Sequence, residues 1–155
     1  MTKIFSPDLM FNDFIKTAWH KNVQTVEDNK IPIQQSLKVN GIYAAEIHPV
    51  KRDNDIYWAV GFPLNKSWKD EPITSNRTLY FDAVTSCSLT LTVQFQVGQD
   101  ASGIKHKEKI TIGNIDDWET QSCAIPPDFG DNLRLIIFSG PVSDMIILLK
   151  NIYMK

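Results

Sequence analysis

Residues 88–97 read Ser88-Leu89-Thr90-Leu91-Thr92-Val93-Gln94-Phe95-Gln96-Val97, and this stretch decides the fold class. From Leu89 onward, apolar residues occupy every odd position and polar residues every even position. Successive side chains of a strand point to opposite faces, so this alternation predicts a half-buried strand, which threonine and valine also favour. We expect the odd positions to enter a core between two sheets, and Gln94 and Gln96 to face solvent.

Eight further segments have the composition of strands, and turn residues separate them. The turn signals include Asn40-Gly41, Pro63, Gly98 and Gly140-Pro141. Many short strands with this spacing predict an all-β sandwich or barrel rather than an α/β fold. The expected strands cover residues 35–40, 43–47, 56–62, 77–84, 108–112, 119–124, 133–138 and 145–153.

The N-terminal segment is the one place where helix chemistry occurs. Ser6 is a good N-cap, Pro7 suits the first helical position and Asp8 suits the first turn. The following residues 9–15 are mostly apolar. Two interpretations stay open here, one short N-terminal helix and a strand-turn-strand entry into the sandwich.

Size, composition and charge restrict the class of protein. The 155 residues are 43% hydrophobic and 22% charged, which is typical of a folded domain, and we expect residues 1–155 to form a single one. A net charge of −2, from 16 basic and 18 acidic residues, without a dense basic run argues against a nucleic-acid partner. The apolar runs are too short for membrane insertion, so we expect none.

The cellular compartment stays open at this stage. No signal peptide is recognisable, which indicates a cytoplasmic protein if the chain is complete and an extracellular one if it is an excised domain. Cys87 and Cys123 form either two ordinary thiols or one disulfide, and the spacing of two cysteines does not predict a metal site.

The order of these segments resembles the galactose-binding-like jelly rolls that occur as carbohydrate-binding modules beside glycan-active enzymes. The C-terminal half carries most of the resemblance: a strand at residues 109–113, then Asp117-Trp118-Glu119-Thr120-Gln121, the turn 125–132, Leu133-Arg134-Leu135-Ile136-Ile137-Phe138 and a closing strand at 146–154. In the middle, Ser36-Leu37-Lys38-Val39, Tyr57-Trp58-Ala59-Val60 and Thr78-Leu79-Tyr80-Phe81-Asp82-Ala83 follow in the corresponding order. The resemblance implies an antiparallel β-sandwich with jelly-roll topology that binds a glycan.

The same resemblance bears on cofactors and partners. Such modules often hold a structural calcium through an acidic residue of the last strand, just before an asparagine. Here Lys150 precedes Asn151, so the calcium site does not carry over and we expect no cofactor. The implied partners are a glycan ligand and an enzyme domain or partner protein.

Candidate binding residues follow from what sugar recognition needs. Flat apolar rings lie against the C–H faces of a pyranose, and fixed amides, carboxylates and guanidinium groups bind its hydroxyls. The polar positions of the strand at 88–97 present two glutamines, and neighbouring strands could add an aspartate and an arginine to that face. An aromatic pair beside the polar loop 51–55 would form a binding edge, although strand alternation lets only one of the two rings face a ligand. The predicted ligand-binding residues are Trp58, Tyr57, Arg52, Asp82, Gln94, Gln96, Arg134 and Trp19.

Catalysis has little support in the sequence. His20, His48 and His106 lack the spacing of a metal site, and the close carboxylate pairs lie in predicted turns. Motifs for a nucleophile elbow or a phosphate-binding loop are absent from the sequence. We therefore expect a non-catalytic carbohydrate-binding module, with a structural or protein-interaction β-sandwich as the alternative.

Overall fold

The computed structural model describes residues 2–5, 19–23, 34–39, 42–52, 54, 56–64, 71–72, 78–98, 104–112, 118–125 and 132–155. Every regular element in this part of the chain is a strand, which confirms the all-β prediction. The segment at 6–15, for which a helix was one alternative, lies outside the described residues. The strands are β1 (Thr2–Phe5), β2 (Trp19–Lys21), β3 (Gln34–Val39), β4 (Ile42–Ile47), β5 (Tyr57–Pro63), β6 (Glu71–Pro72), β7 (Thr78–Thr85), β8 (Leu89–Gln96), β9 (Ile104–Ile112), β10 (Glu119–Ala124), β11 (Asn132–Leu133), β12 (Leu135–Pro141) and β13 (Ile147–Met154).

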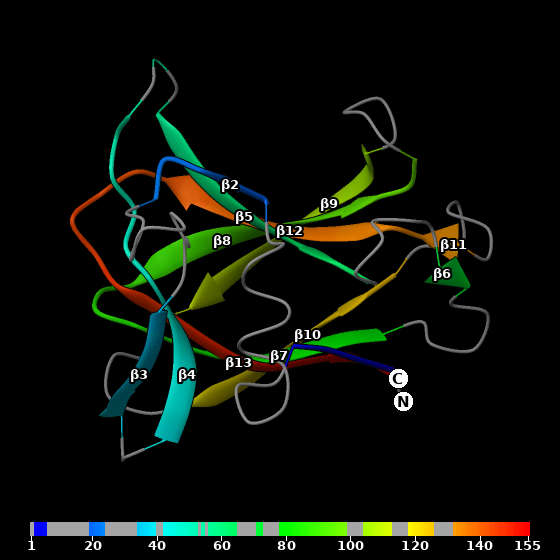
Figure 1. The fold of residues 1–155 in the computed structure, drawn as a ribbon, viewed down its shortest axis with the longest axis horizontal. Coiled ribbons are helices and arrows are strands. Elements are labelled where there is room, and N and C mark those ends of the chain that lie inside the picture. Colours follow the sequence, from blue (N-terminus) through cyan, green and yellow to red (C-terminus); the bar gives the residue numbers. More distant parts are fainter. Residues whose placement is uncertain are drawn as a thin grey trace.

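Two sheets form the sandwich, and we name each by one of its strands. The β7 sheet has the order β10-β7-β13-β4-β3, with β1 also paired to β13, and the β8 sheet has the order β2-β5-β12-β8-β9. All these pairings are antiparallel, and consecutive strands repeatedly cross from one sheet to the other, as in a jelly roll. Figure 1 shows the β8 sheet in the upper half and the β7 sheet in the lower half.

The core lies between the two sheets and contains the odd positions of β8. Leu91, Val93 and Phe95 have no exposed surface, whereas Thr90 just before them is exposed and Thr92 and Gln94 between them are half-buried. The alternation of 88–97 therefore predicts the inward face of β8 correctly. Phe138 of β12 joins the layers, because its ring meets Phe81 of the opposite sheet edge-on at a centroid distance of 5.0 Å.

The end of β12 differs from the expectation. Gly140-Pro141 was predicted to be a turn, but β12 continues through both residues and pairs with the start of β5. Gly140 lies opposite Trp58, whose side chain fills the space where a larger residue would project. The glycine therefore lies inside a strand, close to the Trp58 ring, and does not end the strand.

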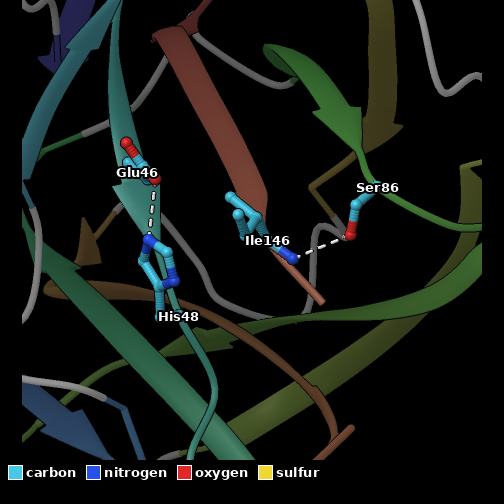
Figure 2. Close-up of polar contacts among 4 residues, drawn as sticks. All are labelled: Glu46, His48, Ser86 and Ile146. Carbon is cyan, nitrogen blue, oxygen red and sulfur yellow. Dashed lines mark hydrogen bonds and ion pairs between the residues drawn. The ribbon is translucent and has the colours of Figure 1, made fainter. Parts of the chain in front are cut away.

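Polar contacts fix the end of the sandwich where β4 finishes and β13 begins. His48 Nε2 lies 2.7 Å from Oε1 of Glu46, and the Ser86 hydroxyl accepts a hydrogen bond of 2.9 Å from the backbone N–H of Ile146 (Figure 2). The Glu46 side chain is buried, so its hydrogen bond to His48 offsets part of the cost of removing a carboxylate from water. Elsewhere, Cys87 is exposed and Cys123 is buried, and no disulfide joins them.

Candidate functional site

The outward face of the β8 sheet is the face turned away from the core. Strand pairing places side chains from five strands on it in two adjacent rows. One row runs Trp19, Gly61, Ile137, Gln94, and the next runs Lys21, Ala59, Ser139, Thr92, Lys109. Trp19 and Lys21 therefore lie on the same face as the polar positions of β8, with β5 and β12 between them, although about 70 residues separate them in sequence.

Two exposed aromatic rings stand on this face. Trp19 of β2 is 44% exposed and Tyr57 of β5 is 51% exposed. Trp19 pairs with Gly61, four residues along β5 from Tyr57, so the Cα atoms of the two aromatics lie about 14 Å apart. The outward residues of β5 between them are Ala59 and Gly61, which are too small to rise between the rings. Both rings are therefore exposed on the same face of the sheet.

The centre of the face, on β5 and β12, is apolar and closely packed. Ala59, Leu135 and Ile137 form a cluster separate from the main core, and all three are buried. Gln94 is half-buried, and its side-chain amide donates a hydrogen bond to Ser139 Oγ at 3.0 Å. The accessible polar groups consequently lie around this centre rather than on it.

The two neighbouring aromatic residues of β5 point to opposite faces of the sheet, as strand alternation predicts. Tyr57 points outward, and Trp58 is 0% exposed within the main core. Trp58 was among the predicted ligand-binding residues, but a ring without accessible surface cannot stack on a sugar. The candidate site therefore keeps Tyr57 and loses Trp58.

Gln96 and Arg134 lie together at the end of the sheet away from Tyr57. Both donate hydrogen bonds to the carbonyl oxygen of Gly98, Arg134 Nη1 at 2.6 Å and Gln96 Nε2 at 3.5 Å. Gln96 is only 6% exposed, which corrects the expectation that both glutamines of β8 face solvent. These side chains hold the turn after β8, where Gly98 has a left-handed backbone with φ of 70°.

Asp82 does not join this face, because β7 belongs to the other sheet. Its carboxylate accepts hydrogen bonds from Thr120 Oγ1 at 2.7 Å and from Asn151 Nδ2 at 2.9 Å. The expectation that Asp82 comes from a neighbouring strand of β8 is therefore wrong. Its role in the structure is to connect β7 with β10 and β13.

Arg52 is exposed, and its backbone is joined to that of Tyr57 through a residue that escaped the sequence analysis. Asn22 follows β2, has a left-handed backbone with φ of 53° and is 3% exposed. Its Oδ1 accepts a hydrogen bond from the Arg52 backbone N–H at 2.8 Å, and its Nδ2 donates one to the Tyr57 carbonyl at 2.9 Å. Asparagine tolerates this backbone conformation, but its long-range partners leave no local pattern in the sequence.

The charge of the face is positive where its side chains are described. Lys21 and Lys109 lie at opposite ends of one row, and the described outward side chains of these five strands include no Asp or Glu. On the inward side of β2, burial and the charge of Arg52 lower the pKa of His20 below its ordinary value. Among the described residues, no group of three His, Cys, Asp or Glu side chains could hold a metal ion.

Comparison with known proteins identifies the fold. No protein-family model matches the chain, and no curated protein matches its sequence. The chain has the fold of jelly-roll carbohydrate-binding modules. A family 30 carbohydrate-binding module superposes with a TM-score of 0.69 at 12% identity, covering 99% of this chain and 86% of that one.

Two other solved structures extend the comparison. A family 11 carbohydrate-binding module from Clostridium thermocellum, solved in complex with a β-1,3-1,4-mixed-linked tetrasaccharide, has a TM-score of 0.59 at 14% identity and covers 88% of this chain and 86% of that one. An exo-beta-agarase has a TM-score of 0.69 at 11% identity, and the match covers 100% of this chain but 25% of the agarase chain.

No helix in the described part of the chain has the length and apolarity to span a membrane.

Proposed function

We propose that this protein binds carbohydrate without altering it chemically, through the outward face of the β8 sheet. The observation that carries the proposal is the pair of exposed rings, Trp19 and Tyr57, on adjacent strands of one face. Exposed aromatic side chains present an apolar surface that water does not satisfy and that the C–H face of a pyranose can cover. The fold shared with carbohydrate-binding modules supports the same conclusion.

The polar part of the interaction comes from the groups around the rings. Lys21, Thr92, Gln94 and Lys109 lie in the paired rows of this face, and the backbone of Arg52 is joined to that of Tyr57 through Asn22. Hydroxyl groups of a sugar both donate and accept hydrogen bonds, so they can pair with ammonium, guanidinium, amide and threonine hydroxyl groups. Stacking then supplies much of the affinity, while these groups select the orientation of the ligand.

We propose a binding role rather than catalysis for this face. Glycoside hydrolysis requires two carboxyl groups on either side of the scissile bond, and the described outward side chains of the β8 sheet include none. Because a quarter of an agarase chain matches this fold, we further propose that the protein acts as one module that holds an attached or partner enzyme near its glycan.

The decisive experiment combines a glycan array with variants of the two rings. The parent protein should bind a subset of glycans on the array, and Trp19→Ala and Tyr57→Ala should each weaken that binding by about tenfold or more, as expected for a central interface aromatic. Tyr80→Ala is the matched control, because it removes an aromatic ring that stacks on Tyr153 in the β7 sheet. Its binding should equal that of the parent.

Two results would contradict the proposal. Equal glycan binding by the parent, Trp19→Ala and Tyr57→Ala would show that the outward face of the β8 sheet is not the glycan-binding surface. An array without binding, together with a stable oligomer in light scattering, would favour the protein-interaction alternative.

A further inference from the structure

Asn22 connects three segments that the chain brings together at one edge of the proposed site. It follows β2 directly, three residues after Trp19. Its backbone carbonyl accepts a hydrogen bond from Val50 at 2.8 Å, and its side chain bonds both the Arg52 N–H and the Tyr57 carbonyl. One buried amide thus links the strand of Trp19 to the start of the strand of Tyr57 and to the loop that carries Arg52.

We propose that Asn22 is a positioning residue that orders the Tyr57 and Arg52 side of the glycan-binding face relative to Trp19; this inference rests on the proposed function. The two aromatics lie on different strands, so a single ligand can contact both only if the spacing of those strands is fixed. Regular pairing of β2 with β5 covers Trp19 to Lys21 and stops before Asn22. Beyond the last paired residues, the hydrogen bond from the Asn22 side chain to the Tyr57 carbonyl joins β2 to the start of β5.

The same amide orders the loop before β5. Pro49 forms a β-bridge with Val23, and the backbone N–H groups of Val50 and Arg52 donate hydrogen bonds to Asn22. A loop held in its binding geometry before the ligand arrives avoids an entropic cost at binding. Losing these bonds should therefore weaken ligand affinity even though Asn22 itself is buried and lies beneath the surface.

Asn22→Gly is the most informative variant. Glycine adopts positive φ without strain, so the backbone and the carbonyl that accepts from Val50 are preserved while both side-chain bonds are lost. Asn151→Gly is a closely matched control. Asn151 also has a left-handed backbone, with φ of 50°, and a side-chain bond, but it lies in the β7 sheet and its partner is Asp82.

The first measurement needs no ligand. Amide hydrogen exchange at Arg52 should accelerate by about tenfold or more in Asn22→Gly, because its hydrogen-bond acceptor is gone. The exchange rate should stay at the parental value in Asn151→Gly. Equal protection of Arg52 in the parent and Asn22→Gly would overturn the inference.

The second measurement is binding, by calorimetry, to soluble β-1,3-1,4-mixed-linked glucan and to agar oligosaccharides. Asn22→Gly should bind about tenfold more weakly than the parent, and Asn151→Gly should bind equally well. In a Tyr57→Ala background, Asn22→Gly should cost much less, because the ring that it positions is already absent. A purely structural role would give additive losses.

The outcomes separate this inference from the function beneath it. Full affinity in Asn22→Gly, with loss in Tyr57→Ala, would overturn the role of Asn22 and leave the glycan site intact. A parent that binds neither probe nor any glycan of the array would contradict the proposed function, and the role of Asn22 with it. If Asn22→Gly does not fold, Asn22→Asp replaces it, since aspartate keeps the acceptor for Arg52 and loses the donor to Tyr57. It should bind more weakly than the parent while the Arg52 amide stays protected, and full affinity in this variant would overturn the role of Asn22.

Discussion

Gly140 lies directly opposite Trp58 on β12 and β5, and a Cβ atom at Gly140 would be 3.1 Å from Trp58 Nε1. The indole is completely buried, and Leu89 Cδ1 would be 3.6 Å from the same Cβ. A side chain at position 140 would therefore be in tight contact with the ring, which would have to shift by a few tenths of an ångström. This packing accounts both for the glycine inside β12 and for the loss of Trp58 from the candidate site.

Gly140→Ala should reduce the free energy of unfolding by about 1–3 kcal/mol, the usual cost of inserting a methyl group into a packed core. Urea unfolding monitored by fluorescence measures it. The cost should be smaller in a Trp58→Leu background, because leucine has no atom beyond its Cδ carbons and so none at the position of Nε1. Equal costs in the two backgrounds would show that the Trp58 ring is not the obstacle.

Asp82→Ala should destabilise the protein without weakening glycan binding. It removes the acceptor of two partly exposed hydrogen bonds, for a loss of about 1–2 kcal/mol in thermal or urea unfolding. Thr120→Val should cost less, since the bond from Asn151 remains. Loss of glycan binding in a folded Asp82→Ala variant would instead place the ligand on the β7 sheet.

Protonation of His20 should destabilise the folded protein. Burial and Arg52 lower its pKa in the folded state below 6.5, so the unfolded chain takes up the proton first as the pH falls. The contribution of neutral His20 to stability is present above the unfolded pKa and is lost as the pH falls below it. The free energy of unfolding should decrease more between about pH 7.5 and 5.5 in the parent than in His20→Gln. A His20 pKa at or above 6.5 in an NMR titration would contradict this account.

Calcium should have no effect on stability. Lys150 pairs in register with Asp82, and its ammonium nitrogen lies 4.4 Å from the centroid of the Trp118 ring. A divalent cation at this position would meet an existing positive charge. We expect the same Tm in calcium and in EDTA, measured by differential scanning calorimetry. A higher Tm in calcium would reveal a cation site that the last strand does not indicate.

The sequence predicted much of the fold because the inward residues of single strands follow a local rule. The alternation from Leu89 to Phe95 is enough to assign the buried face of β8, and the same rule separates Tyr57 from Trp58. The end of β12 was missed because Gly140-Pro141 has the composition of a turn. Only the position of Trp58 on the neighbouring strand explains why glycine is needed there.

The site was predicted less well, because its composition depends on which strands become neighbours. Asp82 and Gln94 have the same local appearance in sequence, yet they occupy different sheets. Gln96 occupies a position that alternation assigns to the outward face, yet it is buried. It lies at the end of the strand, where Arg134 is hydrogen-bonded to the turn at Gly98. The short strand β2 and Asn22 acquire their importance from contacts with β5 and its preceding loop, which no local pattern reports.

Chemical-shift mapping with the best glycan from the array tests the central claim most directly. Addition of the glycan should shift the amide signals of β2, of the start of β5 and of the neighbouring Arg52, together with the indole N–H of Trp19. The signals around Tyr80 and Tyr153 of the β7 sheet should not move. Shifts confined to the β7 sheet, or none at saturating glycan, would contradict a sugar-binding role for the outward face of the β8 sheet.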